Sequence, residues 1–252
     1  MLIPKDQVPL SPPPPYPGSD APASRRIVID ETSQFISGSY PLYDLLSIST
    51  KSGSVSVSVS LHSASDDKPA PAVLNIRSQS GSVNAQLEHL FAGHVTRDYI
   101  TSIATQSGSM SGTYPLGLQT SLDARSGSIN GVSLVVMPVN STGPRHLQTT
   151  ARGGSTSLHV KESFWTGDKT AKWWQGMTSR HESQSGSMNI DYPDSWEGTI
   201  EAQSSSGSVS VTGRGVQIIS RIHGKVYAQK GSKDGGKIVV DVHSGSVDLR
   251  FG

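Results

Sequence analysis

Short runs in which every second residue is apolar recur along most of the chain. One example is Val55-Ser-Val-Ser-Val59, and another surrounds Leu46 and Ile48. Successive side chains of a β-strand point to opposite faces, so a period of two residues is typical of a strand with one buried face. The pattern therefore predicts an all-β protein.

A Ser-Gly-Ser phrase, followed by an apolar residue, recurs between these runs. The spacing between copies is irregular, so the repeats must carry loops of unequal length. We expect a bend of the chain at each copy. The glycines at the centres of the copies, which the pattern predicts to be structural corners, are Gly38, Gly53, Gly81, Gly108, Gly127, Gly154, Gly186, Gly207 and Gly245.

The apolar positions change phase at each Ser-Gly-Ser phrase. Around Gly53, for example, Val55 and Val57 follow at even offsets, whereas Ile48 precedes at an odd offset. A phase shift requires a bulge or a tight bend, which glycine tolerates because it has no side chain. Small serines would let successive coils stack about 4.8 Å apart and form hydroxyl ladders. The sequence thus predicts a β-helix or solenoid of irregular coils with Ser-Gly-Ser corners.

The first 25 residues differ in composition from the rest. Many of the 15 prolines of the chain lie there, and proline removes a backbone donor, so this stretch is expected to be a disordered proline-rich tail. Residues 26–252 are expected to form the solenoid domain. Within the tail, Pro13, Pro14, Pro15 and Tyr16 form a Pro-Pro-Pro-Tyr segment, the form that WW domains bind as a polyproline II helix. The alternative is a solubilising leader without a partner.

Composition excludes several function classes. The net charge is only +1, so we expect no nucleic acid as a partner. The chain has no cysteine, which excludes disulfides and thiolate chemistry, and no spacing of histidines or acidic residues predicts a metal site or a cofactor. No segment is apolar enough to span a membrane or to act as a secretory leader. The expected location is the cytoplasm, with the cell surface as the alternative.

Several phrases resemble the family of adhesin-like β-solenoid domains, which occurs in bacteria and has fungal relatives of unknown function with proline-rich leaders. The phrases are Phe35-Ile-Ser-Gly-Ser-Tyr40, Leu46-Ser-Ile-Ser-Thr-Lys-Ser-Gly-Ser-Val-Ser-Val57 and Tyr192-Pro-Asp-Ser-Trp-Glu-Gly-Thr-Ile200. The likeness covers residues 27–252. It implies a right-handed parallel β-helix and supplies no catalytic residues.

A tryptophan-rich insert interrupts the repeats. Trp165, Trp173 and Trp174 are three of the four tryptophans of the chain. Their aromatic faces could stack on sugar rings or contact a protein surface, so they are candidate ligand-binding residues. Alternatively, the insert folds back and covers one side of the solenoid.

The repeats and corners predict the fold strongly, whereas no motif predicts catalysis. The sequence therefore indicates a non-catalytic structural or interaction module whose solenoid side binds a protein partner. The first alternative is a carbohydrate-binding or adhesion protein at the cell surface that uses the tryptophan insert. The second is a polysaccharide-acting β-helix enzyme, although the spacing of the acidic and basic candidates singles out no catalytic group; these are Asp123, Arg125, Arg152 and Asp191 to Asp194. The last repeat runs to the final residue without an evident cap, so self-association through the solenoid ends is also expected.

Overall fold

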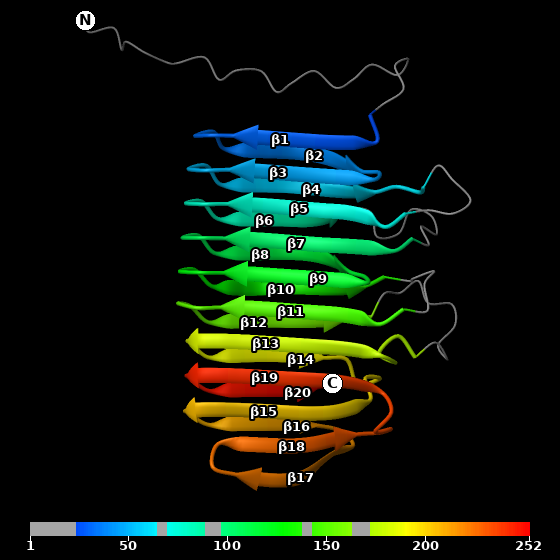
Figure 1. The fold of residues 1–252 in the computed structure, drawn as a ribbon, viewed down its shortest axis with the longest axis vertical. Coiled ribbons are helices and arrows are strands. Elements are labelled where there is room, and N and C mark those ends of the chain that lie inside the picture. Colours follow the sequence, from blue (N-terminus) through cyan, green and yellow to red (C-terminus); the bar gives the residue numbers. More distant parts are fainter. Residues whose placement is uncertain (1–23, 65–69, 89–96, 138–142, 163–171) are drawn as a thin grey trace, which may run out of the picture.

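The computed structural model of the protein describes residues 24–64, 70–88, 97–137, 143–162 and 172–252. These residues form 20 β-strands and no helix, so no described helix could cross a membrane. The strands lie in two sheets that face each other along the length of the molecule (Figure 1). The all-β prediction is therefore confirmed.

Strands of odd number form one sheet, together with one strand of even number, β18, and the other even-numbered strands form the second sheet. In spatial order the eleven-stranded sheet contains β1 (Arg26–Glu31), β3 (Leu45–Thr50), β5 (Ala72–Ser78), β7 (Tyr99–Thr105), β9 (Gln119–Ala124), β11 (Arg145–Ala151), β13 (Met177–Ser185), β19 (Gly236–Ser244), β15 (Gly198–Ser206), β18 (Lys225–Lys230) and β17 (Val216–Ile222). The nine-stranded sheet contains β16 (Val209–Gly213), β20 (Val247–Phe251), β14 (Met188–Tyr192), β12 (Thr156–Lys161), β10 (Ile129–Val136), β8 (Met110–Leu116), β6 (Val83–Glu88), β4 (Val55–Leu61) and β2 (Ile36–Leu42).

Neighbouring strands are parallel everywhere except around β18. From β1 to β16, and again for β19 and β20, a strand of one sheet is followed by a strand of the other, so each such pair makes one layer of a stack (Figure 1). Only β18 runs antiparallel to its neighbours, β15 and β17. The prediction that short extended segments lie directly over one another is confirmed for the parallel strands.

The hydrophobic core lies between the two sheets. Val55 and Val57 after the corner and Ile48 before it are all buried, as the phase shift predicts. Equivalent residues of the other layers belong to the same continuous cluster. Burying a Val or Ile side chain contributes roughly 1.5 to 3 kcal/mol, so the repeated layers together give a large core.

Glycine is required at the corners because the backbones of successive layers approach too closely for a side chain. A Cβ atom on Gly81 would lie 2.0 Å from the carbonyl oxygen of Gly53, and one on Gly108 would lie 2.1 Å from that of Gly81. The contact recurs through the stack, where Gly127, Gly154, Gly186, Gly245 and Gly207 each face the carbonyl oxygen of the preceding glycine. We call this series, which starts at Gly53, the glycine column.

The structure corrects one of the predicted corners. Gly38 lies inside β2, opposite Val57, and a Cβ atom there would meet only the Tyr40 ring at 3.7 Å. Gln34, not Gly38, provides the carbonyl oxygen that faces Gly53. Close approach is common to the glycine column, whereas positive φ is not, because Gly108 lies outside that region and Gly186 has a φ of 129°.

Serines that follow the column glycines form the predicted polar ladder. The Ser82 amide donates to the Ser54 hydroxyl at 3.2 Å, and the Ser128 amide donates to the Ser109 hydroxyl at the same distance. Near the far end the Ser208 hydroxyl donates to that of Ser246 at 3.1 Å. The first two bonds give partners to backbone amides of the corner, and the third joins two hydroxyls of neighbouring layers.

The last repeat does not form the end of the stack, contrary to the expectation from sequence. Strand β19 lies between β13 and β15, and β20 lies between β14 and β16 (Figure 1). The layer made of β15 and β16 therefore lies farther out, and the β17–β18 hairpin extends the eleven-stranded sheet beyond it. The chain leaves one layer open after β14 and fills it with its last two strands.

We predict that Gly108→Val lowers the free energy of unfolding by about 3 kcal/mol or more, because the new side chain must displace the Gly81 backbone. Ser109→Ala, one residue away, removes a single exposed acceptor and should cost about 1 kcal/mol or less. Urea unfolding followed by far-UV circular dichroism measures both. Similar small losses in the two variants would contradict the glycine column.

Candidate binding groove

A row of polar residues crosses the outer face of the nine-stranded sheet. His159 on β12 is the register partner of Asp191 on β14, which is in turn the partner of Arg250 on β20. Neighbouring strands lie about 4.8 Å apart, so these side chains stand next to one another. The row continues through Ser133 and Thr113 on one side and Thr212 on the other.

A groove of about 940 Å³ lies at this row, where the strands of the nine-stranded sheet end. Its apolar lining includes Val135, Tyr192 and Phe251, all of which are largely buried. Charged side chains surround this apolar part, namely Lys161, Glu162, Asp191, Asp194 and Arg250. The groove thus combines an apolar floor with a rim that carries both signs of charge.

Two close contacts of acidic side chains fix the polar row. His159 Nδ1 lies 2.7 Å from Asp191 Oδ2, with 41% and 27% of the two side chains exposed. Arg250 pairs with Asp248 on its own strand. Asp248 first and Asp191 second raise the pKa of the Arg250 guanidinium, so it stays charged at all ordinary pH values. Arg250 is nevertheless more than half exposed and can reach a ligand.

Two of the candidate tryptophans pack beside the groove rather than project from it. Trp173 and Trp174 each expose 8% of their surface, and their rings meet edge to face at 5.6 Å. The Trp173 Nε1 donates to Glu162 at 3.4 Å, and the Ser195 hydroxyl donates to the same carboxylate. This burial favours the interpretation that the insert covers the solenoid. Ligand binding by these residues stays a prediction, and Trp165 lies outside the described residues.

A buried polar chain lies below the groove floor. The Tyr192 hydroxyl is 3.0 Å from His181 Nε2, and the Thr149 hydroxyl is 2.8 Å from His181 Nδ1. Burial lowers the pKa of His181 to about 3 and raises that of Tyr192, so both groups are neutral in the folded protein. These bonds fix the position of the Tyr192 ring.

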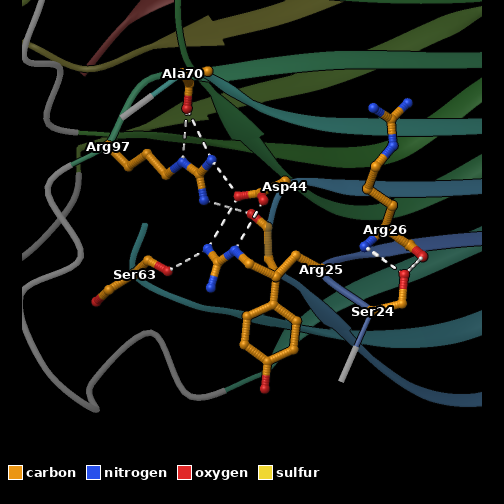
Figure 2. Close-up of polar contacts among 8 residues, drawn as sticks. Ser24, Arg25, Arg26, Asp44, Ser63, Ala70 and Arg97 are labelled. Atoms are coloured by element: carbon orange, nitrogen blue, oxygen red, sulfur yellow. Dashed lines mark hydrogen bonds and ion pairs between the residues drawn. The ribbon is translucent and has the colours of Figure 1, made fainter. Parts of the chain in front are cut away.

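A separate polar cluster holds the loop side of the first layers together (Figure 2). Arg97 is 2% exposed and donates to the carbonyl oxygens of Tyr43 at 2.6 Å and Ala70 at 2.8 Å, and to Asp44 at 2.8 Å. Arg25 binds the same carboxylate at 2.8 Å. Hydrogen bonds from Arg25 and then Arg97 lower the pKa of Asp44 to about 2. The Arg97 guanidinium is fully engaged with the protein, so the cluster is structural.

The described residues contain no group of three or more side chains that could hold a metal ion. Comparisons with protein-family models, with curated proteins and with solved structures find no match for this chain. The predicted WW ligand, Pro13 to Tyr16, lies outside the described residues.

Sequence reasoning did not assemble the polar row, although the chain contains a signal for it. The sequence pattern groups Asp191 with Asp194, Asp123, Arg125 and Arg152 as acidic and basic residues, and not with His159 or Arg250. His159, Asp191 and Arg250 each stand five residues after a glycine of the column, as do Thr113 and Thr212. Equal offsets from the corners place residues at equal heights on neighbouring strands.

We predict that the protein loses stability as the pH falls below 6.5, the ordinary pKa of histidine. Between pH 6.5 and about 3 the unfolded chain binds a proton at residue 181 that the folded chain excludes. Stability should therefore fall by up to about 1.4 kcal/mol per pH unit. Unfolding measured from pH 7.5 to 4.5, above the range where Asp44 titrates, tests this window.

The matched variants for this test are His181→Gln, which removes the buried titrating group, and His146→Gln, which removes an exposed histidine of β11. The first should flatten the dependence of stability on pH, and the second should leave it unchanged. Parallel curves for His181→Gln and the unaltered protein would contradict the assignment.

Proposed function

We propose that the chain is a non-catalytic interaction module that binds a short segment of a protein partner in the groove on its nine-stranded sheet. The observation that carries the proposal is the groove itself, with its apolar floor and its rim of both charges. Ligand sites are typically concave and largely apolar, with a few polar groups that fix orientation.

The charges of the rim support a protein segment over a polyanion. Lys161 and Arg250 are balanced by Glu162, Asp191 and Asp194. An acidic glycan or a nucleic acid would meet carboxylates along most of such a groove, whereas a peptide can offer apolar and oppositely charged side chains together. The proposal therefore keeps a protein as the partner.

The surroundings of the polar row support a binding role rather than catalysis. Ser133, His159 and Asp191 stand on three neighbouring strands, a sequence of residue types known from nucleophilic catalysis. Such catalysis also needs free donors that stabilise an oxyanion. Ser133, His159 and Asp191 lie in paired stretches of their strands, where the N–H groups take part in the strand ladders.

We further propose that the stack is a closed, right-handed β-solenoid and that the chain belongs with the adhesin-like β-solenoid domains. Parallel strands joined by crossover connections are right-handed in nearly all proteins, which supports the handedness. The recurring Ser-Gly-Ser corners support the family. An experimental structure of the full chain tests the handedness directly.

A peptide-display selection on the full-length protein tests the groove. We predict that selected peptides lose affinity at least about tenfold on Arg250→Glu, because a charge that contacts the peptide is reversed. Arg180→Glu is the matched control, since Arg180 also pairs with an acidic residue two positions along its strand, on the other sheet, and is 53% exposed against 56% for Arg250.

Equal losses in both variants, or a selection without binders, would contradict the groove proposal. A glycan array run beside it addresses the carbohydrate alternative. Binding to a glycan that Arg250→Glu abolishes, without any peptide binder, would replace the protein partner by a sugar.

We also propose that the proline-rich tail recruits a WW domain through Pro13 to Tyr16. We predict that Tyr16→Ala reduces binding to WW domains by at least about tenfold in a fluorescence titration, because the tyrosine fills the aromatic groove. Tyr40→Ala is the control outside the segment and should bind unchanged. WW binding that is absent, or that survives Tyr16→Ala, would remove this part of the proposal.

A further inference from the structure

Exposed large hydrophobic side chains are confined to the two ends of the stack, within the part of the chain that the structure describes. Among the described residues, the strands between the two ends carry none of them. Apolar surface gathered in one place commonly marks a contact with another molecule. The exposed residues are Val28 and Phe35 at the β1–β2 end, and Ile218, Ile219, Ile222 and Tyr227 at the β17–β18 end.

Among the described residues, strand β1 forms the open edge of the eleven-stranded sheet at its end of the stack. The carbonyl oxygens of Arg25 and Glu31 accept bonds from the strand β3 side. Backbone groups alternate in direction along a strand, so those of Arg26, Val28 and Asp30 point away from β3. The Ser24 hydroxyl binds the Arg26 carbonyl at 2.8 Å, which leaves the groups of Val28 and Asp30 along the open edge.

The sequence of β1 is complementary to itself when it is read in opposite directions. Its central residues are Arg26-Ile-Val-Ile-Asp30, a cation and an anion that flank three β-branched residues. Arg26, Val28 and Asp30 are exposed, whereas Ile27 and Ile29 face the core. Neither Arg26 nor Asp30 forms an ion pair with another described residue.

We propose that the protein forms a two-fold symmetric dimer in which β1 pairs antiparallel with β1 of a second copy. The axis passes between the two Val28 residues, so each Arg26 stands opposite Asp30 of the second copy, and Ile27 stands opposite Ile29. The outward backbone groups of Val28 then exchange two hydrogen bonds across the axis. Opposite charges that face each other across paired strands stabilise the pairing.

The β1 edge is more complementary to β1 of a second copy than to β17, which lies at the other end of the stack. In a head-to-tail contact β1 would lie against β17 of the next copy. Register followed across the eleven-stranded sheet places Gln217 and Ile222 at the heights of Arg26 and Asp30, so neither charge meets an opposite charge. The pairing of β17 also shifts between Ile218 and Ser220, and such bulges oppose edge pairing.

Strand β2 permits the approach of a second copy at this end. It is the outermost strand of the nine-stranded sheet and lies beside β1 at the same end of the stack (Figure 1). Its exposed residues include Ser37, Gly38 and Ser39, which are small. Phe35, 62% exposed in the turn between β1 and β2, lies where the second copy would cover it. In the dimer, the Ser24 hydroxyl would turn away from Arg26.

Sedimentation equilibrium on the full chain tests the dimer. At concentrations up to about 100 μM the protein should reach twice the 26.6 kDa mass of the chain and no more, because a two-fold contact closes on itself. Val28→Lys places two ammonium groups at the axis and should raise the dissociation constant at least about tenfold. Ile219→Lys is the matched control, because Ile219 is 66% exposed at the far end against 68% for Val28, and it should dimerise normally.

A charge exchange separates this pairing from a general effect on folding. Arg26→Asp alone should weaken the dimer at least about tenfold, and Arg26→Asp combined with Asp30→Arg should restore it, because the reversed charges again face each other. Thermal unfolding should show that all variants are folded. A mass that stays at one chain, a mass that grows beyond two chains, equal loss in both lysine variants, or no rescue by the exchange would each overturn the proposal.

Discussion

Close approach between backbones at the corners is the constraint on which the rest of the structure depends. Because Gly81 and Gly108 have no side chain, each rests directly on the carbonyl group of the layer before it. The strands on both sides of the corner then reach hydrogen-bonding distance of their neighbours, in register. That register aligns the core columns inside and the polar rows outside. One steric requirement therefore positions both the buried residues that stabilise the fold and the exposed residues that form the groove.

Local sequence pattern is enough to predict most of the architecture. Alternation around each corner identifies the buried faces, as at Ile48, Val55 and Val57, because a strand that lies against a core repeats every two residues. Gly38 shows the limit of the pattern, since a Ser-Gly-Ser phrase inside a strand reads the same as one at a corner. The local sequence pattern also does not determine the order of the layers in the stack. No feature of residues 236–251 shows that they lie inside the stack, because that position depends on pairing with strands on both sides.

The candidate groove is harder to predict because its parts come from separate layers. Insertions of unequal length separate His159, Asp191 and Arg250, so their distances along the chain hide their common height in the stack. The tryptophans stand out in the composition, yet their contacts depend on burial, and burial depends on the layers beneath. The role of Arg97 cannot be predicted from local sequence for the same reason, since its partners Tyr43, Asp44 and Ala70 come from loops that precede other strands.

The placement of β19 and β20 has a consequence for how the outer layers are attached. These two strands connect the block of β15 to β18 to β13 and β14 by hydrogen bonds. No pairing between described strands joins the two blocks directly. Detaching residues 236–251 would therefore separate the stack into two sets of strands, so the attachment of β15 and β16 depends on a segment that follows them in the sequence.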